Sequence, residues 1–533
     1  MRSATPGALA ALAGLTLLAG VARFAAVDFG LPDRFRPDEE YMISRALGVG
    51  DDPNPHFAIY PAAQMYLQHV ALRTAAALDP EATGDFGAAY AGQGVARAHL
   101  VGRQLSALLG TISVPALYWA LAPVWGSGAG LGAAAVLATA TLHVRESKYA
   151  TTDAPAVFVL VLAMGALLRL VVGGKLRLAI TAGALTGLAA ATKYPAGAFA
   201  VALGLAQFGT RWREGRSLWR TPFDLRPWAS LWALCAVFSV ATPWFWIDWA
   251  QTSHDFQYQR GFILAGTGNP LAGSGWNWLF AAALPDSVGP ELALGMIVAT
   301  VWVIFVRRPP GGLSLAGFVL VSLVGIASSK YSFYRYLMVP LPALAACTGL
   351  ALAALVDACR CRLGRTVGAL VALAAVSVLL VPGTIRDYKL LRLLARRDTR
   401  TLAREWIEQN IPPGSAIATP QPDSPYGKPQ LEGRNPWTTL ELSGPLVGDA
   451  RWILIDESPL GFYSPGASAA TLGRLATTAR LRLDLDPYKP GTPAPVFDQA
   501  DAFYVPLRHG SSMKRPGPRI RIWEVATAEG TTP

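Results

Sequence analysis

Phe35-Arg36-Pro37-Asp38-Glu39-Glu40-Tyr41 places three adjacent carboxylates shortly after an apolar run, Gly7 to Val27, whose only charge is Arg23. That run is long enough to cross a bilayer, which takes about 20 apolar residues. Acidic side chains at the mouth of a membrane core are costly there, so these carboxylates are candidates for function. The alternative is a solvated loop in which Pro37 begins a helix and the acids favour the helix dipole.

The composition of the chain is that of a membrane protein. Of its 533 residues, 52% are hydrophobic and only 15% are charged, which is more apolar than a soluble protein of this size needs to be. About eleven runs are long and apolar enough to be predicted as spans. They lie at 7–27, 98–122, 127–143, 154–172, 177–192, 194–210, 229–247, 289–306, 312–328, 336–356 and 366–383. We therefore expect a polytopic α-helical membrane protein.

The Lys and Arg residues of the short loops predict the orientation of these spans. With the N-terminus in the cytoplasm, basic residues recur in the inner loops, as at Lys175, Arg211, Arg307 and Arg360. A first outer loop at about 28–96 and another at about 248–288 then lie on the opposite side. Within the first outer loop, the apolar spacing of Ala62 to Leu78 predicts a helix in the plane of the membrane surface.

The end of the chain is expected to form a separate domain. The basic run from Arg386 to Arg404 would normally hold the last span's end inside, but large domains translocate largely regardless of charge. We predict a transmembrane domain at 1–383 and a small extracytoplasmic α/β domain at 384–533. The latter has a helix pattern at Thr399–Asn410 and strand-like runs at Ser415–Thr419, Trp452–Ile455, Ala502–Leu507 and Ile520–Glu524.

A second acidic stretch falls on the same predicted side as Asp38. Glu146-Ser147-Lys148-Tyr149-Ala150-Thr151-Thr152-Asp153 puts two carboxylates about two helical turns apart. The alternatives are that Asp153 caps the next span, before Pro155, and that Glu146 pairs with Lys148 or Arg145.

Several cations are also predicted at this outer face. Arg103 opens the second span, Lys193 stands at the tight junction of two spans, and Lys330 and Arg335 precede a later one. Arginine forks suit phosphate oxygens and lysine supplies a point charge. The alternative is that the long side chains snorkel to the membrane surface.

Other classes of site find little support. The outer loops and C-terminal region contain no cysteine, so no outer disulfide is expected. The spacing of Cys359 and Cys361 is not that of a metal site. The net charge of +11 suits a membrane surface, and no nucleic-acid-binding module is visible.

The order of these motifs resembles the GT-C membrane glycosyltransferases, which include protein O-mannosyltransferases and bacterial lipid A aminoarabinose transferases. Each motif is short, and the resemblance comes from their order and common side. They are Pro37-Asp38-Glu39, Glu146 to Asp153, Thr192-Lys193-Tyr194, Tyr334-Arg335-Tyr336 followed by Pro340, and Asp387 to Gly414.

The resemblance implies a polyprenyl-phosphate-linked sugar as donor and inverting transfer on the outer face of the membrane. It implies that Asp38 is the base for the acceptor hydroxyl, with Glu39 as neighbour or substitute and Glu146 as a further catalytic carboxylate. Lys193 and Arg335 would bind the lipid phosphate. The full set of predicted substrate-binding residues is Arg103, Lys148, Asp153, Lys193, Tyr194, Lys330, Tyr334 and Arg335.

The same resemblance implies where the enzyme is located and which partners it has. We expect a multi-pass protein of a bacterial inner or plasma membrane, with an acceptor that is a lipid, a glycan or a protein. Membrane lipids are the other expected partners, and nucleic acid is not. No metal is expected to be obligatory, although some members of the superfamily use a divalent ion.

Two other classes of function remain as alternatives. A multi-span transporter of lipids or solutes should show internal repeats and charges near the bilayer midplane, whereas the charges here gather at one face. A non-catalytic subunit of an envelope-assembly complex is the other. Among enzymes, a wall-polymer polymerase or ligase that uses lipid-linked oligosaccharides is a near rival.

Overall fold

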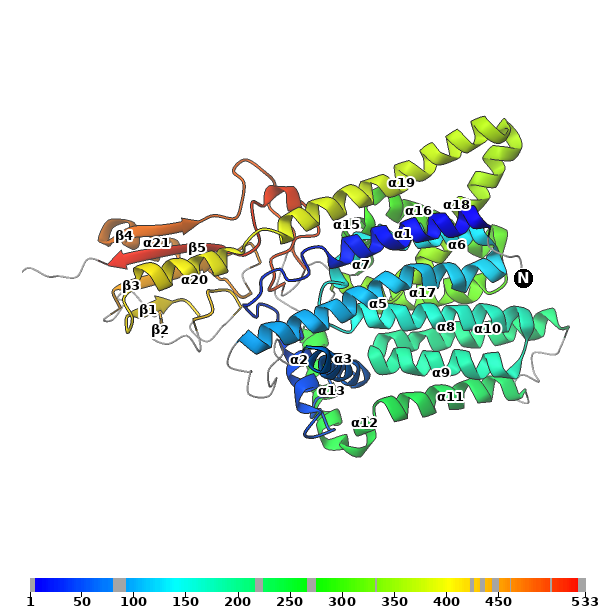
Figure 1. The fold of residues 1–533 in the computed structure, drawn as a ribbon, viewed down its shortest axis with the longest axis horizontal. Helices are drawn as coiled ribbons and strands as arrows, with labels where there is room; N and C mark the ends of the chain where they lie inside the picture. The colour runs from blue at the N-terminus through cyan, green and yellow to red at the C-terminus, as the bar shows by residue number, and fades with distance from the viewer. Residues whose placement is uncertain are drawn as a thin grey trace, which may run out of the picture.

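The computed structural model describes residues 5–79, 93–215, 224–265, 275–330, 333–421, 426–431, 437–442, 450–460, 462–498 and 501–525. These residues form a long helical bundle with a sheet domain at one end, and Figure 1 shows that α1 begins near the opposite end. We call the end that faces the sheet domain the sheet-side end.

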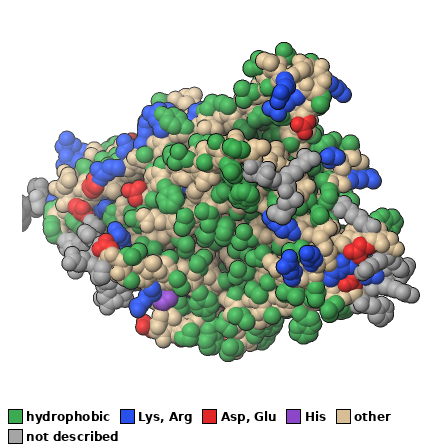
Figure 2. All heavy atoms as spheres, turned by 45° about the vertical axis from the view of Figure 1, so that its right-hand side comes forward, with side chains coloured by type: hydrophobic (Ala, Val, Ile, Leu, Met, Phe, Trp, Pro, Cys, Tyr) green, Lys and Arg blue, Asp and Glu red, His purple; other side chains and the backbone are tan. Residues whose placement is uncertain are grey.

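All eleven predicted spans are largely helical, which confirms a polytopic helical protein. Among the described residues, six helical stretches are long and apolar enough to cross a membrane, and four others are apolar but shorter. The bundle helices are α1 Pro6–Phe24, α5 Gln93–Trp125, α6 Ser127–Ala138, α8 Asp153–Gly173, α9 Leu176–Thr192, α10 Phe199–Arg213, α11 Leu225–Ala241, α16 Pro290–Trp302, α17 Gly312–Ser328, α18 Leu341–Leu363 and α19 Arg365–Leu394. Figure 2 shows hydrophobic side chains over much of the bundle surface, as lipid contact requires.

Some predicted spans are wrong as continuous helices, among them those at 127–143 and 229–247. The span at 127–143 ends at Ala138, and a short helix, α7 Thr141–Glu146, follows after an extended Ala140. The span at 229–247 breaks at Thr242, because the residue before a proline is pushed away from helical geometry. The short helix α12 Trp244–Ile247 follows Pro243.

Short helices lie across the sheet-side end of the bundle (Figure 1). The predicted first outer loop contains α2 Pro37–Gly48 and α3 Ala63–Leu78. The helix start at Pro37, which is the alternative interpretation of the acidic stretch, is therefore present, and the helix predicted at 62–78 is confirmed. The region predicted as a loop at 248–288 is mostly helical instead, with α13 Trp249–Ala265, α14 Gly275–Trp278, a π-helical turn at Leu279–Ala283 and α15 Leu284–Val288.

Two 3₁₀ turns carry predicted site residues at this end. The turn η2 Tyr194–Ala198 connects α9 to α10 and follows Lys193 directly. The turn η6 Tyr334–Met338 precedes α18 and contains Arg335.

The C-terminal domain is a five-stranded sheet with a helix on each face. The strands are β1 Ala416–Thr419, β2 Thr438–Glu441, β3 Trp452–Glu457, β4 Ala479–Leu485 and β5 Arg519–Val525. Their order is β2-β1-β3-β5-β4, with β1 parallel to both neighbours and β5 antiparallel to both of its neighbours. The predicted strands near 415, 452 and 520 are therefore confirmed, and β2 and β4 lie where the sequence analysis expects no strand.

Alternation along β3 explains the two covering helices. Trp452 and Leu454 face the helix α20 Thr399–Asn410, which begins and ends as predicted. Ile453 and Ile455 point to the other face, where α21 Ala469–Thr478 packs. Successive side chains of a strand point to opposite sides, so β3 presents apolar side chains to both helices.

The predicted strand at 502–507 is wrong. Asp501 accepts hydrogen bonds from the backbone N–H groups of Phe503 at 2.9 Å and Val505 at 3.1 Å, so these donors are satisfied without a partner strand. The side chains of Phe503 and Val505 pack with Phe29 of the helical domain. The apolar alternation that resembles a strand is a contact between the two domains.

Helices α9 and α11 approach each other closely because α9 contains glycines four residues apart. A Cβ atom at Gly183 would overlap the backbone of Ser230, and one at Gly187 would overlap the backbone of Leu234. Small residues at this spacing let membrane helices pack backbone to backbone.

We predict that Gly187→Ala lowers the thermal stability of the detergent-solubilised protein, because the added methyl group forces α9 and α11 apart. Overpacking of this kind costs about 1–3 kcal/mol. Gly204→Ala is the matched control, since a Cβ at this glycine of α10 would meet nothing within 4 Å. Equal melting temperatures for the two variants would contradict the close approach of α9 and α11.

Candidate active site

Asp38 is the most open of the predicted site carboxylates. Its side chain is 25% exposed, and the other three expose 3% or less. The helix α2 places it in the first turn, where carboxylates are favoured by the helix dipole. Its position gives a substrate access that the other carboxylates lack.

Asp38 is held by three neighbours. The Tyr60 hydroxyl donates to Oδ1 at 3.0 Å, the Arg335 guanidinium pairs with Oδ2, and the Nε atom of Arg36 lies 3.7 Å from Oδ2. Burial raises the pKa of the Asp38 carboxyl, but Arg335 and Arg36 outweigh burial and lower this pKa to about 2. Asp38 is therefore ionised and paired in the unliganded protein.

A second ion pair lies beside the first. The Nζ atom of Lys193 is 2.5 Å from Oδ1 of Asp153, and both side chains are almost fully buried. Arg335 interacts electrostatically with both Asp38 and Asp153. The structure thus brings together four of the predicted residues, two acidic and two basic, from α2, α8, the start of η2 and η6.

Glu39 faces the protein interior and not this cluster. Its carboxylate accepts hydrogen bonds from Arg103 at 3.0 and 2.8 Å and from the backbone N–H of Ala150 at 2.7 Å. Arg103 also donates to the backbone oxygens of Val27 at 3.2 Å and Phe29 at 2.7 Å. Burial raises the pKa of Glu39, but Arg103 outweighs it and the net shift is downward. This geometry favours a structural role for Glu39 and Arg103.

Glu146 is also buried. It accepts a hydrogen bond from Nε of Arg145 at 2.8 Å through Oε1, while its Oε2 atom has no hydrogen-bond partner among the described residues. The Nη2 atom of Arg36 lies 3.9 Å from Oε2. Glu146 is therefore linked to Asp38 through Arg36.

The remaining predicted residues surround the cluster without joining it. Lys148 donates to the backbone oxygens of Arg23 and Ala25, at 3.1 and 2.6 Å. The hydroxyl of Tyr194 donates to the backbone oxygen of Ala58 at 3.0 Å. Lys330 is exposed, two residues after α17 ends. These contacts favour structural roles for Lys148 and Tyr194.

The sheet domain supplies a carboxylate that the sequence analysis missed. Asp498 accepts a hydrogen bond from the backbone N–H of Tyr334 at 3.1 Å and one from Arg145 at 3.2 Å. Asp286 accepts from the Tyr334 hydroxyl at 2.9 Å and from Arg508 at 2.8 Å with each carboxylate oxygen. The turn that carries Arg335 is thus braced by the C-terminal chain.

The sheet domain also holds the loop that leads to Asp38. Asp33 forms an ion pair with Arg404 and accepts a hydrogen bond from Thr401 at 2.9 Å. The Arg400 guanidinium stacks over the ring of Phe35, with 3.6 Å to the ring centroid. Both partners of the Asp38–Arg335 pair therefore lie on backbone fixed by the C-terminal domain.

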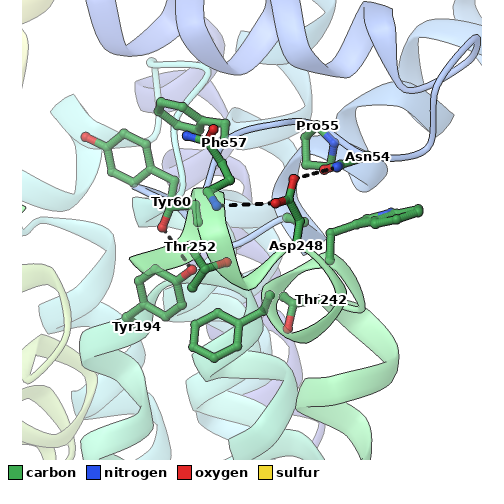
Figure 3. A pocket seen from close by; sticks show the side chains of 13 residues that line it. Asn54, Pro55, Phe57, Tyr60, Tyr194, Thr242, Asp248 and Thr252 are labelled. Atoms are coloured by element: carbon green, nitrogen blue, oxygen red, sulfur yellow. Dashed lines mark hydrogen bonds between the residues drawn. The ribbon is translucent and has the colours of Figure 1, made fainter. Parts of the chain in front are cut away.

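A hollow next to the cluster is shown in Figure 3. The rings of Tyr60 and Tyr194 line it, together with the polar side chains of Asn54 and Asp248. The amide of Asn54 donates to Asp248 at 2.9 Å, which joins the first outer loop to the start of α13. Tyr60 connects this hollow to Asp38 through its hydroxyl.

Arg36 and Tyr60 could have been found from the sequence, since Arg36 belongs to the acidic stretch itself and Tyr60 to the loop that follows. Nothing in the sequence pairs Asp498 or Asp286 with this site. Within the described residues, no group of three or more His, Cys, Asp or Glu side chains could hold a metal ion. The expectation that no metal is obligatory stays a prediction.

Comparisons with known proteins give one family match. A family model described as dolichyl-phosphate-mannose-protein mannosyltransferase matches residues 80–256. No curated protein matches the chain.

Two solved structures align with this chain at low sequence identity. The archaeal oligosaccharyltransferase AglB from Archaeoglobus fulgidus, in complex with an inhibitory peptide and a dolichol-phosphate, aligns with a TM-score of 0.53 and 11% identity, over 93% of this chain and 74% of that chain. ArnT from Cupriavidus metallidurans bound to undecaprenyl phosphate aligns with a TM-score of 0.47 and 14% identity, over 99% of this chain and 100% of that chain. The likeness to AglB shows a common fold.

We predict that Glu39→Gln destabilises the protein strongly, because it leaves Arg103 buried without a counter-charge. Breaking a buried ion pair in this way costs about 3–5 kcal/mol. The measurement is the melting temperature in detergent, with Glu291→Gln as control, since the Glu291–Arg386 pair is half open to solvent and such pairs contribute about 0–1 kcal/mol. A Glu39→Gln protein as stable as the control would contradict the structural role.

Proposed function

We propose that this chain is a glycosyltransferase of the GT-C superfamily and that it moves a sugar from a polyprenyl-phosphate-linked donor to an acceptor hydroxyl, with the partial family match and the shared fold in support. Transfer takes place on the outer face of the membrane and inverts the anomeric carbon. The observation that carries the proposal is the position of Asp38, an accessible carboxylate flanked by two guanidiniums at the sheet-side end of the bundle.

Two findings support a polyprenyl phosphate as the carrier of the sugar. The matching family is described by a dolichyl-phosphate-mannose donor, and AglB, which shares the fold, was solved with a dolichol-phosphate. Cations beside Asp38 suit the phosphate of such a donor, because arginine and lysine stabilise phosphate oxygens. Arg335 and Lys193 are the residues to which we assign this role.

The proposed reaction is a single displacement. Asp38 takes the proton of the acceptor hydroxyl as the acceptor oxygen forms its bond to the anomeric carbon. The bond from that carbon to the phosphate oxygen breaks, and the polyprenyl phosphate leaves with the electron pair. Arg335 and Lys193 stabilise the negative charge that develops on the phosphate, in a site that is poor in water.

The acceptor hydroxyl is proposed to reach Asp38 from the hollow in Figure 3, because Tyr60 both lines that hollow and hydrogen-bonds to Asp38. The acceptor is a lipid, a glycan or a protein, and the transferred sugar is a hexose or a pentose. In the proposed orientation, the N-terminus is cytoplasmic and the domain at 384–533 is extracytoplasmic, in a bacterial inner or plasma membrane.

We expect Asp38→Asn to abolish transfer when membranes are given a panel of polyprenyl-phosphate sugars. Loss of a general base typically costs a factor of about 100 to 10,000 in rate. Asp51→Asn is the matched control, an exposed carboxylate of the same loop whose loss leaves the site untouched. Activity equal to wild type in an equally expressed Asp38→Asn protein would rule out Asp38 as the base.

We also expect transfer to continue after exhaustive treatment with EDTA, since Arg335 and Lys193 supply the positive charge that a metal would bring to the phosphate. Initial rates with and without the chelator provide the measurement. A loss of activity that Mg²⁺ or Mn²⁺ restores would show that a metal is required.

A further inference from the structure

Arg36 is an additional cation in the site that the proposed reaction has not yet used. Its side chain is only 11% exposed, and its guanidinium stacks on the ring of Tyr149, 4.2 Å from the ring centroid. It lies 3.7 Å from Asp38 and 3.9 Å from Glu146. Both distances are those of loose ion pairs and exceed hydrogen-bond length.

The guanidinium of Arg36 is held in place without being tied to either carboxylate. Its backbone directly precedes Pro37 and adopts an extended conformation, and the neighbouring Phe35 is packed under Arg400 of the sheet domain. The stacked ring orients the flat guanidinium between two carboxylates. The N–H groups of the Arg36 guanidinium are thus available to a ligand whose oxygen atoms approach it more closely than the carboxylates of Asp38 and Glu146 do.

Asp38 consequently shares two guanidiniums, one bound tightly and one loosely. Arg335 pairs directly with Oδ2, and the Nε atom of Arg36 lies 3.7 Å from the same oxygen. A phosphate ester that enters beside Asp38 presents several oxygens to the same two forks, and arginine forks bind phosphate oxygens in pairs. The phosphate and the Asp38 carboxylate must therefore compete for these cations.

We propose that Arg36 and Arg335 form a two-arginine cradle that binds the Asp38 carboxylate in the unliganded protein. When the polyprenyl donor binds, the same two guanidiniums bind its phosphate instead. Binding of the phosphate then releases Asp38, which becomes an effective base only when the donor is in place. This inference rests on the proposed function and assigns Arg36 to the phosphate site.

The exchange of Asp38 for phosphate at the two arginines explains how Asp38 can become basic enough for the proposed reaction. While Asp38 is paired with Arg335 and flanked by Arg36, its pKa is about 2, and so weak a base takes a proton from a hydroxyl poorly near neutral pH. A phosphate that takes over the two guanidiniums removes the groups that stabilise the carboxylate charge and adds a negative charge nearby. Both effects raise the pKa of Asp38 and make it a stronger base.

The test is the affinity of the full-length protein for undecaprenyl phosphate, the leaving group without a sugar, measured without any acceptor. If Asp38 competes with phosphate, Asp38→Asn binds the lipid phosphate more tightly than wild type, by about ten-fold, equivalent to about 1.4 kcal/mol. Glu40→Gln is the matched control: it removes a charge next to Asp38, but Glu40 pairs with Arg34 and not with the cradle. An equal gain in affinity for undecaprenyl phosphate in both variants would indicate only the loss of a nearby negative charge and would overturn the proposal.

Arg36 is tested in the same assay. Arg36→Gln should weaken binding by about ten-fold, Arg36→Lys should recover part of the loss, and Arg73→Gln, an exposed cation of α3, should change nothing. In the Arg36→Gln background, the gain from Asp38→Asn should shrink to about three-fold, since one of the contested cations is gone. An undiminished gain would show that Arg36 is not part of the cradle.

Two further ligands separate this inference from the proposed function. Undecaprenol, which lacks the phosphate, should not distinguish Asp38→Asn from wild type. Inorganic phosphate, which lacks the chain, should show the same preference for Asp38→Asn at higher concentrations. A wild-type protein that binds no polyprenyl phosphate would overturn the proposed function, whereas a protein that binds it equally well with Asp38 or Asn at this position would overturn only the cradle.

Discussion

The buried pair of Glu39 and Arg103 is the interaction on which the site depends. Two charges taken out of water are stable only when their hydrogen bonds are satisfied, and here each partner also bonds to backbone, at Ala150, Val27 and Phe29. One pair therefore ties α2 to α5, to the turns that follow α1 and to the turn that follows α7. The position of Asp38 is fixed by its neighbour in the sequence, because α2 has no freedom to rotate about its axis.

The sheet domain is the second constraint on the same residues. It contacts the segment that leads into α2 through Arg400 and Arg404, and it braces the Arg335 turn through Asp498 and Arg508. These contacts connect the two sides of the Asp38–Arg335 pair through a domain that contributes no group to the proposed chemistry. The sheet domain in this way determines how far apart the Asp38 and Arg335 side chains lie, and the rate of a reaction depends steeply on the placement of the reacting groups.

The helical fold and the gathering of charged side chains at one end of the bundle could be predicted from the sequence, because membrane spans follow from length and apolarity and charges near them are rare. Positions within the site could not. The segment at 502–507 has the alternation of a strand, but its apolar side chains pack on Phe29 in another domain, and period-2 spacing does not reveal which surface the residues cover. By contrast, β4 shows Leu481, Leu483 and Leu485 alternating with charged residues, a signal that could have been recognised.

The choice between Asp38 and Glu39 shows why a pattern of residue types is insufficient. Adjacent residues of a helix point about 100° apart, so two neighbouring carboxylates cannot both face the same substrate. The one that turns inward must be neutralised by a buried partner, and Arg103 does this for Glu39. The one that turns outward stays accessible to ligands. The sequence contains both carboxylates but no information on which faces inward, because that is decided by the position of Arg103, more than sixty residues away on α5.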